Sequence, residues 1–197
     1  MKTPYNEIVN IASIGSQTNP ISLNEILRKA NDEQLTPAAQ NKERVLFLGI
    51  DVQQDFMDNG ALGVPGAHGD VERMTQFIYN NMDKITNIAV SIDTHTPHQI
   101  FHPCWWIDEN GNNPAPYTPI TLADLDSGKY RAVIYPRQSR DYVEHLEKDG
   151  KKTLCVWSYH CLQGTSGAAF ENQFANMIYF HSVAKKAVTQ RLVKGDR

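Results

Sequence analysis

The sequence predicts an α/β protein built on a Rossmann-like parallel sheet with flanking helices. Two short apolar runs, 45–50 and 88–92, each end in an aspartate, Asp51 and Asp93. Such runs are typical of strands buried on both faces of a parallel sheet. An amphipathic stretch lies between them, and alternating strands and helices indicate right-handed crossovers. We therefore expect a ligand site beyond the carboxyl ends of these strands.

The first 44 residues are predicted to form an extension ahead of the core domain, which spans 45–197. Their composition is polar, with a loop around Pro20. Ser22 and Glu25 have the spacing of a capping box and predict a helix over 23–31. Pro37 is expected to interrupt any helix that follows.

The remaining core elements follow from apolar periodicity and turn residues. The sequence predicts helices over 71–83 (capped by Asp70), 140–149 and 168–183, and strands over 153–157 and 191–193. The strand at 153–157 is expected to be the third to open onto the same sheet edge. Residues 94–138 are rich in proline and predicted to be irregular, and a loop this long is usually functional.

Composition excludes several classes of protein. The chain has 197 residues, 41% hydrophobic and 21% charged, which is typical of a globular domain. A net charge of −3 without a basic run argues against a nucleic-acid partner. No apolar stretch reaches the ~18 residues of a membrane span, and no signal pattern is present. Three cysteines fit a reducing compartment, so a cytoplasmic protein is predicted.

One carboxylate and two imidazoles form a candidate metal site. Asp93 and His95 alternate along an extended segment and can face one ion together, and His160 follows the next predicted strand. This set suits zinc, manganese or iron. His98 and His102 are further candidates in the same loop. The alternative is that this histidine-rich loop is only polar surface.

For each of the other candidate catalytic residues, an ordinary structural role is the alternative. Asp51 is either a general base or a hydrogen-bonded turn former. Cys104 and Cys161 are candidate nucleophiles, but a buried structural thiol is the alternative, and Cys155 is expected to be inert core. Lys194 ends a short strand, where a lysine is normally just solvated.

Four segments together resemble the isochorismatase-like cysteine hydrolases and, within them, the nicotinamidases. The segment 51–56 is similar to that family's D-x-Q-x-D-F, and 93–95 to its D-x-H metal motif. The segment 157–165 resembles W-P-x-H-C-V-Q-G-T, with Ser158 in place of the proline, and 193–195 resembles its K-G segment. The resemblance covers about 45–197 and implies the isochorismatase-like hydrolase fold.

The resemblance also implies roles in amide hydrolysis through a cysteine thioester. Asp51 is implied to accept the thiol proton, and Lys194 to be a catalytic residue that holds the thiolate and orients Asp51. Asp93, His95 and His160 are implied to bind a divalent metal ion, with zinc first and manganese or iron as alternatives.

Further roles follow from the same resemblance. Phe56 and Trp157 match the aromatic walls around the substrate ring. Asp55 is implied to contact waters on the metal ion. The long segment 103–150 exceeds that of compact nicotinamidases and resembles larger nicotinamidase-related amidases.

The nucleophile departs from the family pattern. The family's cysteine lies well after the K-G lysine, and none of Cys104, Cys155 and Cys161 matches that position. We therefore expect the nucleophile to be absent from this chain, which would be C-terminally incomplete and contain only the N-terminal part of the sheet. Its first strand should then have an uncovered edge and apolar face. Three explanations would account for the missing nucleophile. In order of preference, they are a clipped or truncated chain, a gene interrupted by an early stop, and a self-sufficient short variant.

The sequence thus predicts a metal-containing, nicotinamidase-like amide hydrolase that acts on nicotinamide or a related small amide. One alternative is a catalytically inactive metal-binding remnant or assembly module. Another is hydrolysis by a metal-activated water without a thiol. The expected partners are the small amide and either further copies of the chain or a missing C-terminal half, with no nucleic acid or membrane.

Overall fold

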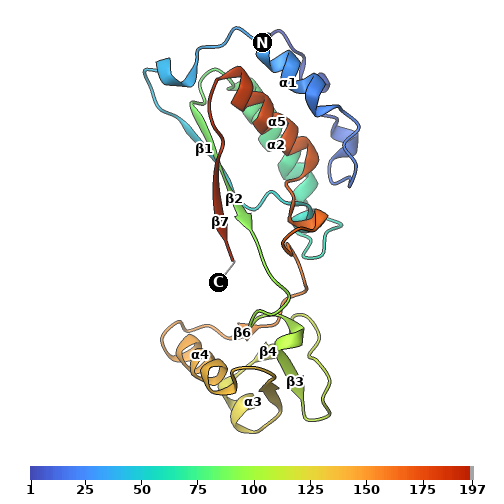
Figure 1. Cartoon of the computed structure of the whole chain (residues 1–197), viewed down its shortest axis with the longest axis vertical. Helices are drawn as coiled ribbons and strands as arrows, with labels where there is room; N and C mark the ends of the chain where they lie inside the picture. The colour runs from blue at the N-terminus through green and yellow to red at the C-terminus, as the bar shows by residue number, and fades with distance from the viewer. Residues whose placement is uncertain (196–197) are drawn as a thin grey trace. The chain divides into compact units, whose positions relative to one another are not determined.

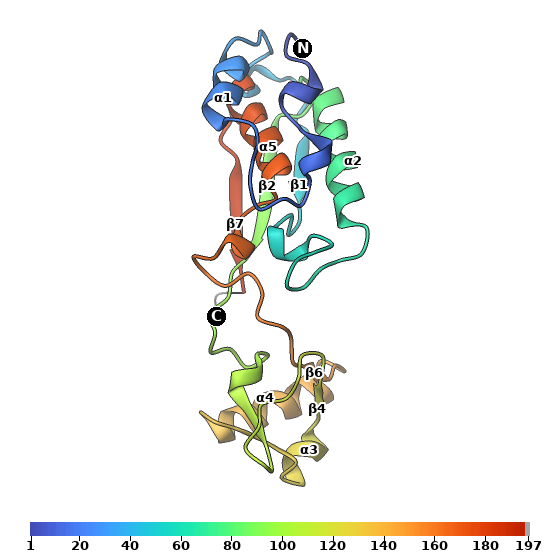
Figure 2. The same ribbon diagram turned by 90° about the vertical axis from the view of Figure 1, so that its right-hand side faces the viewer.

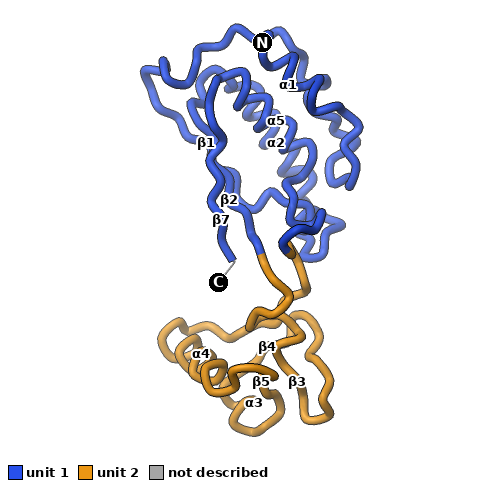
Figure 3. Tube along the Cα trace, viewed as in Figure 1, with its two compact units in different colours: residues 1–94, 163–197 blue, residues 95–162 orange. Residues whose placement is uncertain are grey.

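The computed structural model describes residues 1–195, which form two compact units (Figure 3). Unit 1 contains residues 1–94 and the chain from 163 onward, and unit 2 contains residues 95–162. In chain order, the helices and strands of unit 1 are α1 (Leu23–Asn31), β1 (Leu46–Gly49), α2 (Ala67–Asn80), β2 (Asn87–Asp93), α5 (Asn172–Ala184) and β7 (Gln190–Lys194).

A parallel three-stranded sheet of order β1-β2-β7 forms the centre of unit 1. The predicted α/β class is therefore confirmed. The register places Asp93, the last residue of β2, opposite Lys194, the last residue of β7. The segment predicted as the third core strand, 153–157, does not join this sheet. That prediction is wrong, and β7 takes the place beside β2.

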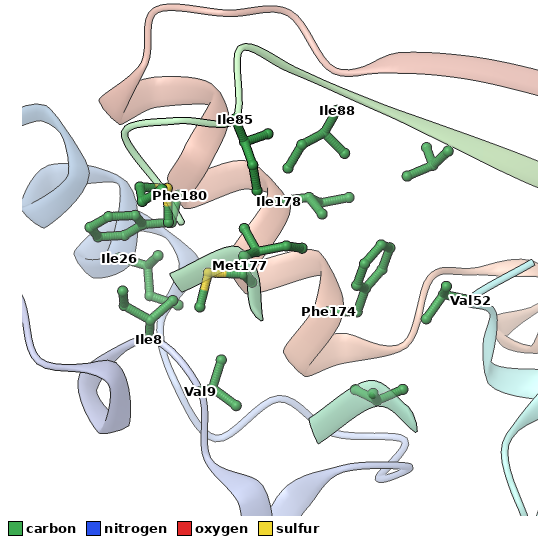
Figure 4. Packing of buried hydrophobic residues seen from close by; sticks show 14 of the residues in the cluster. Ile8, Val9, Ile26, Val52, Ile85, Ile88, Phe174, Met177, Ile178 and Phe180 are labelled. Carbon is green, nitrogen blue, oxygen red and sulfur yellow. The ribbon is translucent and has the colours of Figure 1, made fainter. Parts of the chain in front are cut away.

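Helices α2 and α5 cover one face of the sheet, and α1 packs against α5 on the side away from the strands (Figures 1 and 2). Between them lies the main core of unit 1 (Figure 4). Phe174, Met177 and Ile178 of α5 are fully buried there, together with Ile88 of β2. Burial of this apolar surface is the main term that stabilises the unit.

The other face of the sheet is apolar and open to solvent. Leu46 and Leu48 of β1 are 59% and 47% exposed, and Leu192 of β7 is 53% exposed. The prediction that the first strand is buried on both faces is therefore wrong, because α1, α2 and α5 all lie on the opposite side of the sheet (Figure 1). The prediction that its apolar face is uncovered is confirmed.

The N-terminal segment contributes to the core of unit 1. Ile8, Val9 and Ile26 are buried against α5, and Asn176 Nδ2 donates to the Ile8 carbonyl at 3.2 Å. Helix α1 has the predicted bounds. The predicted capping box is wrong, because the Ser22 side chain accepts no capping bond.

Two helices begin away from their predicted starts because distant or buried carboxylates cap them. Asp58 accepts from the backbone N–H groups of Gly66 (2.6 Å) and His68 (2.9 Å), so α2 begins at Ala67 rather than after Asp70. The buried Glu171 accepts from Phe174 N at 2.7 Å and starts α5 at Asn172.

Unit 2 is built from two antiparallel strand pairs and two helices. Its elements are β3 (Trp106–Asp108), β4 (Pro119–Ile120), α3 (Leu122–Asp126), β5 (Tyr130–Ala132), α4 (Pro136–Lys148) and β6 (Leu154–Cys155). Strand β3 pairs with β5, and β4 with β6. The prediction that 94–138 is irregular is wrong, because strands of two or three residues are too short to show a periodic pattern.

The buried His181 of α5 is expected to make stability fall in acid. Its side chain is 1% exposed and Nε2–H donates to the Ile85 carbonyl at 2.9 Å. Burial lowers the pKa of His181, and the charge of Lys185 lowers it further. The unfolded chain therefore binds the proton near pH 6.5 while the folded chain does not. We expect the free energy of unfolding to fall as pH decreases below 6.5, by up to about 1.4 kcal/mol per pH unit.

Urea unfolding at several pH values between 5 and 8 measures this slope. His181→Asn should be less stable at pH 8 and should lose its share of the acid slope. His145→Asn, on the exposed part of α4, is the matched control and should keep the slope. Parallel pH profiles for wild type and His181→Asn would contradict the prediction.

Candidate metal and acid–base site

Asp51 lies at the carboxyl end of β1 in a strained backbone conformation. Its φ is 54°, in the left-handed region that aspartate tolerates better than most residues. Ser91 Oγ donates to Asp51 Oδ1 at 2.6 Å, and the Asp51 N–H donates back to Ser91 Oγ at 3.0 Å. The carboxylate is therefore held in one orientation and remains partly open to solvent.

Lys194 bridges two carboxylates at the end of the sheet. Its Nζ lies 3.0 Å from Asp51 Oδ2 and 3.1 Å from Asp93 Oδ1. Burial disfavours the charge on this ammonium, but its hydrogen bonds to Asp51 and Asp93 outweigh that effect and raise the pKa of Lys194. The ammonium therefore stays protonated, and it neutralises part of the negative charge between the two aspartates.

Gln53 aligns the backbone of Asp93. The Gln53 side chain is fully buried. Its Oε1 accepts from Asp93 N at 2.7 Å, and its Nε2 donates to the carbonyl oxygens of Asp93 and Ala168, both at 2.8 Å. The side-chain amide thus forms hydrogen bonds with the backbone at the end of β2, as a neighbouring strand would.

Sequence reasoning assigned no role to Ser91 or Gln53. A signal for Ser91 was present, since it is a polar residue inside an apolar strand and shares a strand face with Asp93. For Gln53 the only signal was its match to the Q of D-x-Q-x-D-F, because its partners lie 40 and 115 residues away in the chain.

Asp93, His95 and His160 form the group predicted to bind a metal. Each offers one ligand atom, and these atoms lie within 4.8 Å of one another. All three residues are buried. The grouping follows from the two-residue spacing of Asp93 and His95 and from one contact inside unit 2, where the rings of His95 and His160 have centres 4.8 Å apart. The donor set of one carboxylate and two imidazoles fits zinc, iron or manganese.

Backbone carbonyls orient the imidazoles of unit 2. His160 Nδ1–H donates to the Ser158 carbonyl at 2.7 Å, so Nε2 is the ring nitrogen that could bind a metal ion. The side chain of His102 is also buried. It packs beside His95 and His160. Burial lowers the pKa of His102. His98, in the same loop, is exposed.

The two predicted aromatic residues belong to different units. Phe56 of unit 1 lines a cavity of about 150 Å³ together with Asp51 and Met74. Trp157 of unit 2 is 38% exposed and meets Tyr117 edge to face, with ring centres 5.9 Å apart. The Asp55 carboxylate lies against Gly167, where an added Cβ would come within 2.0 Å of it.

All three cysteines belong to unit 2, whereas Asp51 and Lys194 belong to unit 1. Cys161 is fully buried, and its carbonyl accepts from His95 N at 3.0 Å. Burial raises the pKa of Cys155. Cys104 Sγ donates to the Pro97 carbonyl at 3.0 Å.

Solved structures provide the comparison for this fold, since no protein-family model and no curated protein matches the sequence. The structure of the yeast nicotinamidase Pnc1p is 18% identical, with a TM-score of 0.50 over 79% of this chain and 58% of that protein. The chain has a nicotinamidase-type fold. This is a statement about architecture, since identity at this level shows the fold alone.

Two further structures are similar to the chain. One is Pnc1p bound to the inhibitor nicotinaldehyde, at 18% identity and a TM-score of 0.49 over 78% of this chain and 57% of that one. The other is the Acinetobacter baumanii nicotinamidase–pyrazinamidase, at 19% identity and 0.47 over 80% and 54%. The chain therefore spans a little over half the length of the nicotinamidase structures that it matches.

Across residues 1–195, no helix has the length and apolar character that a membrane span requires.

Proposed function

We propose that this chain provides the acid–base and metal-binding side chains of a nicotinamidase-type amide hydrolase. Its substrate would be nicotinamide or a related small amide. The observation that carries the proposal is Lys194, which joins Asp51 to Asp93 at the carboxyl end of the parallel sheet. Ligands of α/β proteins bind at this edge, and linked titratable groups in such a place are typical of catalytic sites.

Asp51 is the proposed proton acceptor. It would take the proton of a cysteine thiol, whose sulfur would then attack the amide carbonyl carbon. The C–N bond breaks, ammonia leaves with a proton returned by Asp51, and water hydrolyses the thioester to the acid. Lys194 is the second proposed catalytic residue, which would hold the thiolate and orient Asp51, and Ser91 is a positioning residue, because it holds the Asp51 carboxylate in one orientation.

Asp93, His95 and His160 would hold the divalent ion, with zinc as the first candidate. When bound, the ion would act as a Lewis acid that binds a lone pair of the substrate and so positions the substrate. Phe56 would contact the substrate ring from the cavity that it lines with Asp51, and Trp157 is the second proposed aromatic wall. Three free cysteines are consistent with a reducing compartment, and the cytoplasm is the proposed location.

The nucleophilic thiol is proposed to come from outside these 197 residues, either from a longer chain or from a partner. The reason is that unit 1, which contains Asp51 and Lys194, has no cysteine in its sequence. This observation also favours a second candidate function, a metal-binding module without catalytic activity.

The 197-residue chain loaded with zinc is therefore expected to release no ammonia from nicotinamide above the rate of a buffer control. A coupled ammonia assay measures this, with a complete nicotinamidase as positive control. Turnover that is lost in Cys161→Ala or Cys104→Ala would contradict the proposed source of the thiol. Turnover that resists thiol alkylation but not chelation would instead indicate a metal-activated water.

Intact-mass measurement of the protein from its native source separates the two candidate functions. A mass well above 22.2 kDa, together with nicotinamide hydrolysis that Asp51→Asn abolishes, supports the amidase. A mass of 22.2 kDa without hydrolysis supports the metal-binding module.

A further inference from the structure

A cavity of about 270 Å³ lies in unit 1 beside helix α5 and strand β7, and the proposed function uses none of the residues that line it. These residues are Phe170, Tyr179, Ser182, Thr189 and Arg191. Together they provide one cation, three hydroxyl groups and two aromatic rings, and none of them is acidic. Such a lining suits a ligand that has both an anionic and an apolar part.

The strand register places the Arg191 side chain on the face of the sheet that the helices cover. Arg191 lies opposite Val90 of β2, which is 1% exposed in the core of unit 1. Paired residues of neighbouring strands point to the same face, and Thr189, two residues earlier, shares that face. Aliphatic side chains at these two positions would extend the core. An arginine and a threonine leave a polar cavity there instead, which opens to solvent because β7 is an edge strand.

Helix α5 turns a partly exposed stripe toward the same cavity. Most residues of α5 are buried, whereas Tyr179 and Ser182 are half-buried. They are three residues apart and therefore lie on one face of the helix. Ser182 Oγ donates to the Ala187 carbonyl, which fixes the turn after α5. The proton of Ser182 is thus already used, and the hydrogen-bond donors left for a ligand are on the other lining residues.

Two polar groups of the cavity have no partner among residues 1–195. Thr189 Oγ1 is buried and forms no hydrogen bond. The Arg191 guanidinium forms no hydrogen bond and no ion pair with the described residues. A buried hydroxyl without a partner is rare in folded proteins and indicates a missing ligand or water. Because a hydroxyl rotates freely, Thr189 can donate its proton to an acceptor in the cavity.

The aromatic wall of the cavity is fixed before any ligand binds. The ring of Phe170 meets that of Phe174 edge to face, with centres 6.3 Å apart. The backbone of Phe170 pairs with that of Gln53 in an isolated antiparallel bridge. Phe170 is therefore held by the core and by the backbone, and a ligand ring can pack against it without rearranging the protein.

We propose that this cavity binds a small aromatic carboxylate. Arg191 pairs with the carboxylate through two parallel N–H groups, and Thr189 donates its hydroxyl to a carboxylate oxygen. Phe170 and Tyr179 contact the ring of the ligand. One cation balances one carboxylate charge. The cavity is slightly smaller than the roughly 300 Å³ at which drug-sized ligand sites begin, so a ligand of one ring fits. The proposal does not depend on amide hydrolysis.

Titration of the ¹⁵N-labelled chain with benzoate, followed by NMR, tests the site. A metal chelator is present throughout, so that the carboxylate cannot bind a metal ion. We expect saturable shifts of the amide signals of Tyr179, Ser182 and Thr189, with a Kd on the order of 1 mM or below. Benzamide has the ring without the charge, and inorganic phosphate has charge without the ring. Each should bind at least about 10-fold more weakly than benzoate.

Three variants show which groups hold the ligand. Arg191→Gln should bind benzoate about 10- to 100-fold more weakly than wild type. Arg28→Gln, which changes an exposed arginine of α1, is the matched control and should bind as wild type. Thr189→Val keeps the shape of the side chain and removes the unpaired hydroxyl. It should weaken benzoate binding about 3- to 10-fold without lowering the free energy of unfolding in urea, an effect that a purely structural threonine would not produce.

Three results would overturn the proposal. Equal benzoate affinity in Arg191→Gln and wild type, or shifts confined to signals outside the cavity, excludes this site. Phosphate binding as tight as that of benzoate excludes an aromatic carboxylate as the ligand class. Absence of any shift of the wild-type chain at about 10 mM benzoate excludes both. None of these results affects the proposed metal site, which zinc affinity tests separately.

Discussion

Replacing His160 with alanine is expected to weaken zinc binding by at least about 100-fold. Losing a group that merely supports a metal ligand already costs about 10- to 100-fold in affinity, and His160 is one of the grouped ligands themselves. Its ring is buried and its Nδ1–H donates to the Ser158 carbonyl, so its own segment orients the ring. Chelator competition at pH 7.5 measures the loss.

Two variants make this result specific. His145→Ala changes an exposed histidine of α4 and should leave zinc affinity unchanged. Asp93→Asn keeps the shape of a ligand but removes its charge, and it should also lose the ion pair with Lys194. Unchanged zinc affinity in both His160→Ala and Asp93→Asn would rule out this metal site.

Replacing Phe174 with alanine is expected to destabilise unit 1 by about 3–5 kcal/mol, the range for removing a buried aromatic ring. The ring is fully buried in the core between α5 and the sheet (Figure 4). It lies against the backbone of Gly49, where an added Cβ would come within 2.8 Å of the Phe174 ring. The glycine and the ring therefore fit each other closely, and Gly49 has no side chain that could fill the cavity left by alanine.

Urea unfolding followed by circular dichroism gives this change in free energy. Phe77→Ala on α2 is the matched control, because that ring is 55% exposed. It should cost less than about 1 kcal/mol, as most surface substitutions do. Equal losses in the two variants would show that the buried core of unit 1 is not centred on Phe174.

The sequence alone identified those candidate ligands of the site that lie close together in the chain. Asp93 and His95 are separated by one residue in an extended segment, so their proximity needs no knowledge of the fold. Lys194 could be singled out only by resemblance, because nothing in Val193-Lys194-Gly195 tells which strand lies beside it. The structure shows that the neighbour is β2, with Asp93 directly opposite Lys194.

The residues that align the site were not predictable from local patterns. Gln53 satisfies backbone groups of Asp93 and Ala168, and Ser91 binds Asp51 across 40 residues of chain. Ser91 stands out only as a polar residue inside an apolar strand, and Gln53 only as a motif position, and neither observation tells which group it binds. His102 was predicted only as one more candidate of its loop, and its burial became visible only in the structure.

The sequence by itself determined the α/β class, helix α1 and strands β2 and β7, whereas the exposed apolar face of β1 was expected only from the resemblance to a longer family. The class, the helix and the two strands each depend on periodicity or composition over a few neighbouring residues, which local backbone geometry imposes. Only the tertiary structure decided that β7 rather than 153–157 completes the sheet, that 153–157 pairs within unit 2, and that Lys194 faces two aspartates. Strand pairing joins backbone groups that are far apart in the chain, and those bonds leave no pattern in the sequence on either side.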